Sequence, residues 1–168
     1  MIRAALLAAL LAFPAMAPVR AGTLEGRAVT FLVMAWDDPE MPFLEAPGHT
    51  VVVGDGVEFD FAPEGTFSGL QVVPMQVEIG PRRVEVTYPE GAEGWFHDSA
   101  FNGYVLRFET DCALFAGWKL DRAFTTLPVR DDGIFTDHGA LYINVSGMRY
   151  GPEQRLAVDL DVMDCPIS

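Results

Sequence analysis

Positive charge is scarce in this chain. Its 168 residues include 11 lysines and arginines but 24 aspartates and glutamates, which gives a formal net charge of −13 at pH 7. A surface of this sign repels phosphate backbones and anionic lipid, so we expect no nucleic-acid partner and no binding to membrane surfaces. Half of the residues are hydrophobic and the acids are scattered, a composition typical of a folded, soluble domain. The acidic surface then serves solubility, and the alternative is that it binds cations or basic proteins.

Cysteine is almost absent, since Cys112 and Cys165 are the only two. Neither has another cysteine or a histidine at the short spacing of a zinc site. The three histidines, His49, His97 and His138, are too far apart in the sequence to form a paired metal motif. In an exported chain, two cysteines predict one structural disulfide. On the chain-entropy model, closing a loop of this length stabilises a fold by about 4 kcal/mol.

Long hydrophobic runs are also missing, with one exception at the N-terminus. Arg3 precedes an apolar stretch over residues 4–13, and small residues follow it up to Ala21. This layout is typical of a secretory signal peptide, and the stretch is too short to span about 30 Å of hydrocarbon. We predict that residues 1–21 are a cleaved signal peptide. The protein should then be periplasmic or secreted, without membrane insertion after cleavage.

Residues 22–168 would form the mature chain, whose 147 residues suit one domain. Cleavage after Ala17 is the competing site, but it would leave Pro18 beside the scissile bond. Removal of residues 1–21 takes away two arginines and no acid, which changes the formal charge from −13 to −15. We expect this domain to be a monomer, and the sequence does not identify its partners.

The mature chain is rich in strand patterns. Hydrophobic and polar side chains alternate over residues 57–61, 83–88, 141–146 and 155–162. Each segment is typical of a half-buried strand, and residues 28–36, apolar on both faces, suit a central strand. Short turns rich in glycine, proline and aspartate separate these segments. We therefore predict an all-β fold, an antiparallel β-sandwich of jelly-roll or Ig-like kind with eight to ten strands, and a closed barrel is the alternative.

Two further strands are expected in the middle of the mature chain. One covers residues 101–108 and should bury Leu106. The other should turn one face inward, made of Cys112, Leu114, Ala116, Trp118 and Leu120.

Four segments of the mature chain resemble an exported bacterial β-sandwich domain family. They are, in order, "GTLEGRAVTF", "VVVGDGVEFDF", "FNGYVLRF" and "LYINVSGMRYGPEQRLAVDLDV", and together they span nearly the whole mature chain. The resemblance implies export and a β-sandwich fold. It implies no functional residue, because the family has no assigned activity. The chain lacks the C-terminal sorting tail that members often carry, and we do not associate a disulfide at Cys112 and Cys165 with the family.

One short stretch, "HDS", contains the three residue types of a hydrolytic triad in His97, Asp98 and Ser99. Three adjacent residues seldom converge on one reacting atom, and Ser99 lacks the Gly-x-Ser-x-Gly elbow. Aspartate and serine are ordinary loop residues that bond their own backbone. We predict a polar loop that leads into the strand over residues 101–108, with no catalytic residue in it.

Two acidic loops are candidates for binding calcium, the one cofactor that the sequence suggests. Their carboxylates belong to Asp37, Asp38 and Glu40 in the first loop and to Asp131, Asp132 and Asp137 in the second. Hard oxygen ligands on loops are how extracellular modules bind calcium. Neither loop matches the spaced D-x-D-x-D-G pattern, and aspartate also forms turns, so a structural role is the alternative.

Aromatic side chains offer a second kind of site, a platform on which sugars stack. Trp95 lies in a glycine-rich loop and is the aromatic residue that we expect to be exposed. The other candidates, which we expect to fill the core or cap its ends, are Trp36, Trp118, Tyr104 and Tyr142.

These patterns favour a non-enzymatic, exported β-sandwich that binds or scaffolds an unknown ligand. A carboxylate-based extracytoplasmic hydrolase is the alternative from another class, and it would need two carboxyl groups about 5–10 Å apart in one cleft. A calcium- or sugar-binding module is a further alternative. An inhibitor or assembly partner would instead show an exposed apolar patch.

Overall fold

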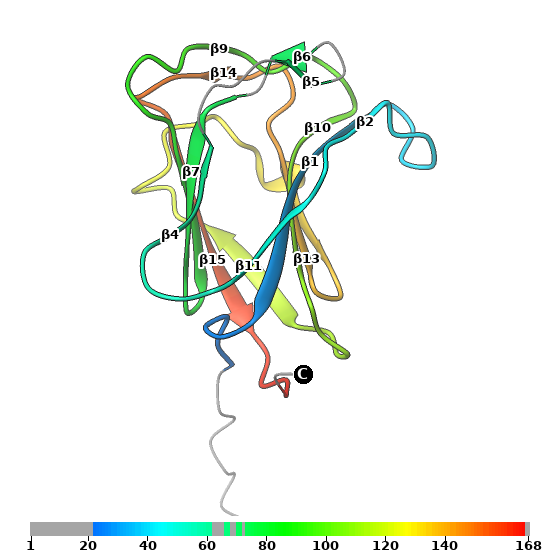
Figure 1. The fold of residues 1–168 in the computed structure, drawn as a ribbon, viewed down its shortest axis with the longest axis vertical. Coiled ribbons are helices and arrows are strands. Elements are labelled where there is room, and N and C mark those ends of the chain that lie inside the picture. The colour runs from blue at the N-terminus through cyan, green and yellow to red at the C-terminus, as the bar shows by residue number, and fades with distance from the viewer. Residues whose placement is uncertain (1–21, 62–65, 68–69, 72, 167–168) are drawn as a thin grey trace, which may run out of the picture.

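Two antiparallel sheets pack face to face in the computed structural model (Figure 1). It describes residues 22–61, 66–67, 70–71 and 73–166. The predicted β-sandwich is confirmed. The segment that we predict to be a signal peptide, residues 1–21, lies outside the described residues.

The first sheet has six strands in the order β12-β13-β10-β1-β2, with β3 also paired to β1. The bounds are β1 Ala28–Trp36, β2 Leu44–Glu45, β3 His49–Val52, β10 Phe101–Phe108, β12 Ile134–Asp137 and β13 Ala140–Asn144. The segment predicted to be a central strand is β1, and it lies between β10 on one side and the two short strands β2 and β3 on the other.

The second sheet has five strands in the order β11-β15-β8-β7-β4. The bounds are β4 Val57–Phe61, β7 Met75–Gly80, β8 Arg83–Thr87, β11 Phe115–Leu120 and β15 Arg155–Val162. The two sheets together hold eleven strands. This exceeds the predicted eight to ten because β2 and β3, each too short to show alternation, share one edge of β1.

Four strands of two residues each lie across one end of the sandwich, at the top of Figure 1. They form two pairs, β9 Gly94–Trp95 with β14 Arg149–Tyr150 and β5 Thr66–Phe67 with β6 Leu70–Gln71. A 3-10 helix, η1 Asp131–Gly133, begins the second acidic loop. Across the described ranges, no helix combines the length and the apolar character needed to cross a membrane.

Alternation predicts which side chains enter the core between the sheets. Val84, Val86 and Tyr88 are buried, as are all the predicted inward positions of β13 and β15. Leu106 on β10 is fully buried. Side chains on the other face of the first sheet form a smaller cluster, in which the ring of Trp36 stacks on Phe101 with centroids 3.9 Å apart.

Two predicted inward positions are wrong, and each stands beside a register shift in its strand pairing. The shift in β11 falls between Phe115 and Gly117, so Phe115 packs against the core while Ala116 is exposed. The shift in β4 falls between Val57 and Phe59, and it leaves Val57 49 % exposed. A bulge inserts an extra residue into a strand, so the side chains before it point to the opposite face of the sheet from the one that unbroken alternation predicts.

The other end of the sandwich is closed by the predicted disulfide between Cys112 and Cys165. The bond joins the loop after β10 to the segment after β15, with Cα atoms 6.3 Å apart. The buried Arg27 side chain donates hydrogen bonds to the carbonyl oxygens of Thr23 and Cys165, at 2.8 and 2.6 Å. A structural disulfide is typical of an oxidising compartment outside the cytoplasm.

Candidate functional site

A pocket of about 800 Å³ opens at the end of the sandwich that β9 and β14 cross. Its walls come from strands of both sheets, from the β9–β14 pair, from the connection between β2 and β3, and from the loop after β9. The lining is Phe31, Leu32, Val33, Leu44, Ala46, Pro47, His49, Phe61, Val73, Met75, Gly94, Trp95, Phe96, His97, Asp98, Asn102, Tyr104 and Tyr150. Most of these side chains are apolar, and the volume is within the range of small-molecule sites.

Aromatic rings form most of the deep wall of this pocket. Phe31 lies beside Phe61 and Tyr104, with ring centroids 5.1 and 5.8 Å apart. Phe96 lies 5.0 Å from Tyr150 and 6.0 Å from Tyr104, centroid to centroid. Tilted and edge-on contacts of this kind hold rings in fixed positions, so the wall is preformed.

Tyr104 and Tyr150 of this wall meet a third buried tyrosine, Tyr88, which is not part of the lining. The hydroxyls of Tyr88 and Tyr104 lie 2.9 Å apart and share a hydrogen bond. Desolvation by burial raises the pKa of Tyr88 and Tyr104 well above the ordinary value, and the nearby phenol of Tyr150 raises both further. Desolvation also raises the pKa of Tyr150. All three therefore remain neutral hydroxyls at physiological pH.

Local sequence explains how Tyr150 reaches the pocket. Tyr150 pairs with Gly94 in the β9–β14 ladder, and its ring lies over that glycine. A Cβ atom at position 94 would stand 2.4 Å from the tyrosine hydroxyl oxygen. The absence of a side chain at Gly94 is therefore what allows the phenol to lie there.

A few polar groups lie among the apolar ones. Asn102 is buried and its amide nitrogen donates to the carbonyl oxygen of His97 at 2.8 Å. His97 and His49 are both exposed, and each makes an edge-on ring contact, with Phe43 and Phe61 respectively. Among the described lining residues none is lysine or arginine, and Asp98 is the single carboxylate.

Trp95, which we predict to be the exposed aromatic residue, is 72 % exposed and lines the pocket. Trp36 and Tyr142 lie instead in the cluster on the outer face of the first sheet, and Trp118 packs against the core. The structure thus brings Trp95 and Tyr104 into one site and leaves the other three aromatic residues outside it.

The stretch from His97 to Ser99 is a loop, as predicted. The Ser99 hydroxyl donates to the carbonyl oxygen of Phe101 at 2.8 Å, and the Ser99 N–H donates to the Ser146 hydroxyl, also at 2.8 Å. The Ser146 hydroxyl in turn donates to the Ser99 carbonyl oxygen at 2.7 Å. These bonds hold the loop against the end of β13, where it forms one wall of the pocket.

The first acidic loop uses two of its carboxylates to accept hydrogen bonds from backbone N–H groups, one in its own backbone and one in the loop before β10. Asp38 accepts a hydrogen bond from the N–H of Glu40 at 3.0 Å, and Asp37 accepts one from the N–H of Ala100 at 3.1 Å. Within the described ranges, no three side chains of histidine, cysteine, aspartate or glutamate are grouped so that they could hold one metal ion. Calcium binding stays a prediction without a preformed ligand set.

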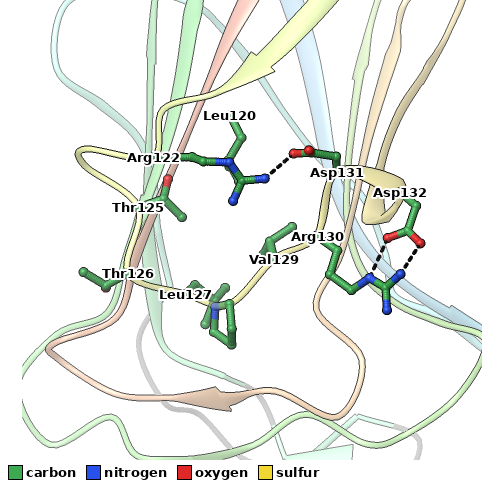
Figure 2. Close-up of a pocket in the computed structure, with 10 residues that line it drawn as sticks. Leu120, Arg122, Thr125, Thr126, Leu127, Val129, Arg130, Asp131 and Asp132 are labelled. Carbon is green, nitrogen blue, oxygen red and sulfur yellow. Dashed lines mark hydrogen bonds and ion pairs between the residues drawn. The ribbon is translucent and has the colours of Figure 1, made fainter.

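The second acidic loop lines a separate hollow of about 740 Å³, shown in Figure 2. There Arg122 and Asp131 form an ion pair at 2.6 Å, and Arg130 and Asp132 form one at 2.8 Å. Asp137 lies apart from this hollow and pairs with His138 at 3.0 Å. The three carboxylates thus face different cationic or ring nitrogens.

A third hollow, of about 620 Å³, has Asp121, Asp131 and Asp159 in its lining, together with the basic residues Lys119 and Arg122. Arg83 binds Asp121 and Asp159 at 2.8 and 2.7 Å, and it also binds Glu85. Hydrogen bonds from Arg83 and from the Phe124 and Ala123 N–H groups lower the pKa of Asp121. A general acid in a glycosidase needs a raised pKa, so this carboxylate has the opposite character.

Sequence reasoning missed most of the pocket. His49, Asn102 and Tyr150 are far apart in the sequence, and nothing in their residue types indicated that they would share a pocket. The pairing of β9 with β14 brings Tyr150 to the loop of Trp95, and two-residue strands leave no alternation from which that pairing could be read.

Comparisons with known proteins found no matching family model, no matching curated protein and no matching solved structure.

Proposed function

We propose that this protein is a binding protein for a small apolar molecule, which it holds in the pocket at the open end of the sandwich. The observation that carries the proposal is a preformed cavity of about 800 Å³ whose walls are mainly aromatic and aliphatic. Sites for drug-sized ligands have this size and this mixture of many apolar groups and few polar ones. Transfer of apolar ligand surface out of water supplies the binding free energy.

The lining also favours binding over hydrolysis. A carboxylate-based glycoside hydrolase, whether retaining or inverting, needs two carboxyl groups in one site. Asp98 is the single carboxylate among the described lining residues. The carboxylates that gather in the two other hollows, Asp121, Asp131, Asp132 and Asp159, bind arginines. We therefore favour the binding role.

Export completes the proposal. The disulfide agrees with an oxidising compartment, and the N-terminal pattern favours a periplasmic or secreted protein. Intact-mass measurement of the exported protein should give a chain that begins at Gly22. A chain that retains Met1 would contradict export by a cleaved signal. The resemblance to the exported bacterial β-sandwich family stays a prediction.

A fluorescent apolar probe tests the binding role. N-phenyl-1-naphthylamine should become fluorescent when it enters the pocket of the mature protein. Ala46 lines the pocket and is half-buried, so Ala46→Trp should fill the space and abolish the signal. The matched control is Val52→Trp, which adds a similar side chain at a position that is 65 % exposed and is not part of the lining.

The comparison of the two variants decides the outcome. Both should melt at temperatures close to that of the parent, because neither change is in the core. Equal probe binding by both variants would show that the probe does not use this pocket, and absence of binding by the parent would contradict the proposed function.

A further inference from the structure

The pocket contains more hydrogen-bonding capacity than its own residues use. Tyr88, Tyr104 and Tyr150 bring three hydroxyl groups together, each on a side chain at most 4 % exposed. One hydrogen bond, between Tyr88 and Tyr104, joins two of them. Within the described part of the chain, the structure gives the Tyr150 hydroxyl no hydrogen-bond partner.

A buried tyrosine usually finds a partner for its hydroxyl, because leaving a buried donor unpaired costs about 1–3 kcal/mol. The Tyr150 hydroxyl is not sealed off, since the one fully buried side-chain polar atom without a partner in the described residues is Nη1 of Arg27. Tyr150 also lines the pocket. A molecule in the pocket can therefore meet this hydroxyl.

The charges around the pocket limit what that molecule can be. The lining offers an anion no arginine or lysine among its described residues, and it contains Asp98. The formal charge of the whole chain is −13. Moving a carboxylate or phosphate from water into such a site would cost free energy that no cationic side chain among the described lining residues repays. Burial also keeps Tyr150 protonated, because desolvation raises its pKa, so its hydroxyl remains a donor.

We propose that the ligand is uncharged, with an apolar body and one acceptor oxygen, of the ketone, ester or amide class, that accepts a hydrogen bond from the Tyr150 hydroxyl. The apolar body occupies the space between Phe31, Phe61 and Phe96, and the carbonyl lies toward Tyr150. This inference rests on the proposed function and adds the chemical class of the ligand.

Three naphthalene probes of similar size test the inference. 2-Acetylnaphthalene carries the acceptor oxygen, 2-ethylnaphthalene lacks it, and 2-naphthoate carries a negative charge. Their dissociation constants are measured by displacement of N-phenyl-1-naphthylamine from the mature protein. The effect of each variant is measured separately for each probe, because the probes differ in their own transfer free energy from water. Only 2-naphthoate and 2-acetylnaphthalene are compared with each other, in the parent, since the cost of removing a carboxylate from water is part of the inference.

Tyr150→Phe removes the hydroxyl and keeps the ring. We expect it to weaken 2-acetylnaphthalene about tenfold, the effect of one lost hydrogen bond, and to leave 2-ethylnaphthalene unchanged. The matched control is Tyr142→Phe, which removes a hydroxyl from the outer-face cluster, away from the lining, and should affect neither probe. The infrared carbonyl band of bound 2-acetylnaphthalene should lie at lower frequency in the parent than in Tyr150→Phe.

The outcomes separate this inference from the proposed function. Failure of N-phenyl-1-naphthylamine and of both neutral naphthalenes to bind the parent would overturn both, whereas failure of 2-acetylnaphthalene alone would overturn this inference and leave the proposed function standing. Binding of both with no effect of Tyr150→Phe on 2-acetylnaphthalene, or with equal loss of both probes, would overturn the donor role of Tyr150 alone. Tighter binding of 2-naphthoate than of 2-acetylnaphthalene would overturn the uncharged class. Selective loss of 2-acetylnaphthalene supports the inference.

Discussion

The hydroxyls of Tyr88 and Tyr104 lie 2.9 Å apart and join the two sheets through the core. Tyr88 follows β8 in the second sheet, and Tyr104 stands on β10 in the first. Both side chains are at most 4 % exposed. A polar contact in such a place fixes how the two sheets align, because either hydroxyl alone would be buried without a partner.

Alkaline pH should destabilise the protein through these tyrosines. Their pKa values are raised in the folded state, so above about pH 10 the unfolded chain binds fewer protons than the folded one. The contribution to the free energy of unfolding is full below that pH and is lost as pH rises further. Urea unfolding at pH 8, 10 and 11 measures it. Full tyrosinate absorbance at 295 nm from a still-folded protein would contradict the prediction.

Leu106→Ala should destabilise the fold strongly. The side chain is fully buried between the sheets, and its loss removes core contacts and leaves a cavity, at a cost of about 2–5 kcal/mol. Ser99→Ala is the comparison, since it removes one loop hydroxyl at a cost of no more than about 1 kcal/mol. Urea unfolding of both variants provides the measurement. A Leu106→Ala variant as stable as the parent would show that this part of the core is wrongly placed.

Gly103→Ala should also be poorly tolerated, for a different reason. Gly103 on β10 faces Asn144 on β13, and a Cβ atom there would stand 1.9 Å from the carbonyl oxygen of Ile143. The two strands would have to separate, which we expect to cost about 1–3 kcal/mol. Gly117→Ala is the control, because a Cβ atom there meets nothing within 4 Å. Equal thermal stability of the two variants would count against the close approach of β10 and β13.

Loss of the disulfide should lower stability and spare the pocket. The bond joins residues separated by 53 positions, and a loop of that length corresponds to about 4 kcal/mol on the chain-entropy model. Replacement of Cys112 and Cys165 together by alanine should lower the urea midpoint by a corresponding amount. Binding of N-phenyl-1-naphthylamine without denaturant should be unchanged, since the pocket lies at the other end. An unchanged urea midpoint would contradict the structural role of the bond.

Alternation along the chain predicted the core well wherever strands are regular. Val84, Leu141 and Leu156 are buried as expected because each stands in an uninterrupted ladder. The prediction was wrong at Ala116 and Val57, since a bulge breaks the period and leaves no mark in the residue pattern. The disulfide could be predicted because two cysteines allow one pairing.

The pocket could not be predicted in the same way. In the sequence, Phe31 and Tyr104 cannot be told apart from ordinary core residues. Whether their rings contact other side chains or line a cavity depends on the distance between the two sheets at that end. Trp95 was the lining residue whose exposure could be predicted, because its glycine-rich surroundings indicated an exposed loop. No sequence feature indicated Tyr150, since only its pairing opposite Gly94 places its hydroxyl beside the pocket.

The closed end of the sandwich has a practical consequence for handling the protein. Gly22 donates a hydrogen bond to the Val162 carbonyl oxygen at 2.9 Å, so both ends of the described chain lie together beside the disulfide. Strand β9, which contains Trp95, lies at the far end (Figure 1). A tether attached at either end of the described chain would link the domain to a bead, a sensor surface or a fusion partner. The pocket would then face away from the support. A short linker between the two ends would likewise permit circular permutation, with new termini placed in a loop away from the pocket.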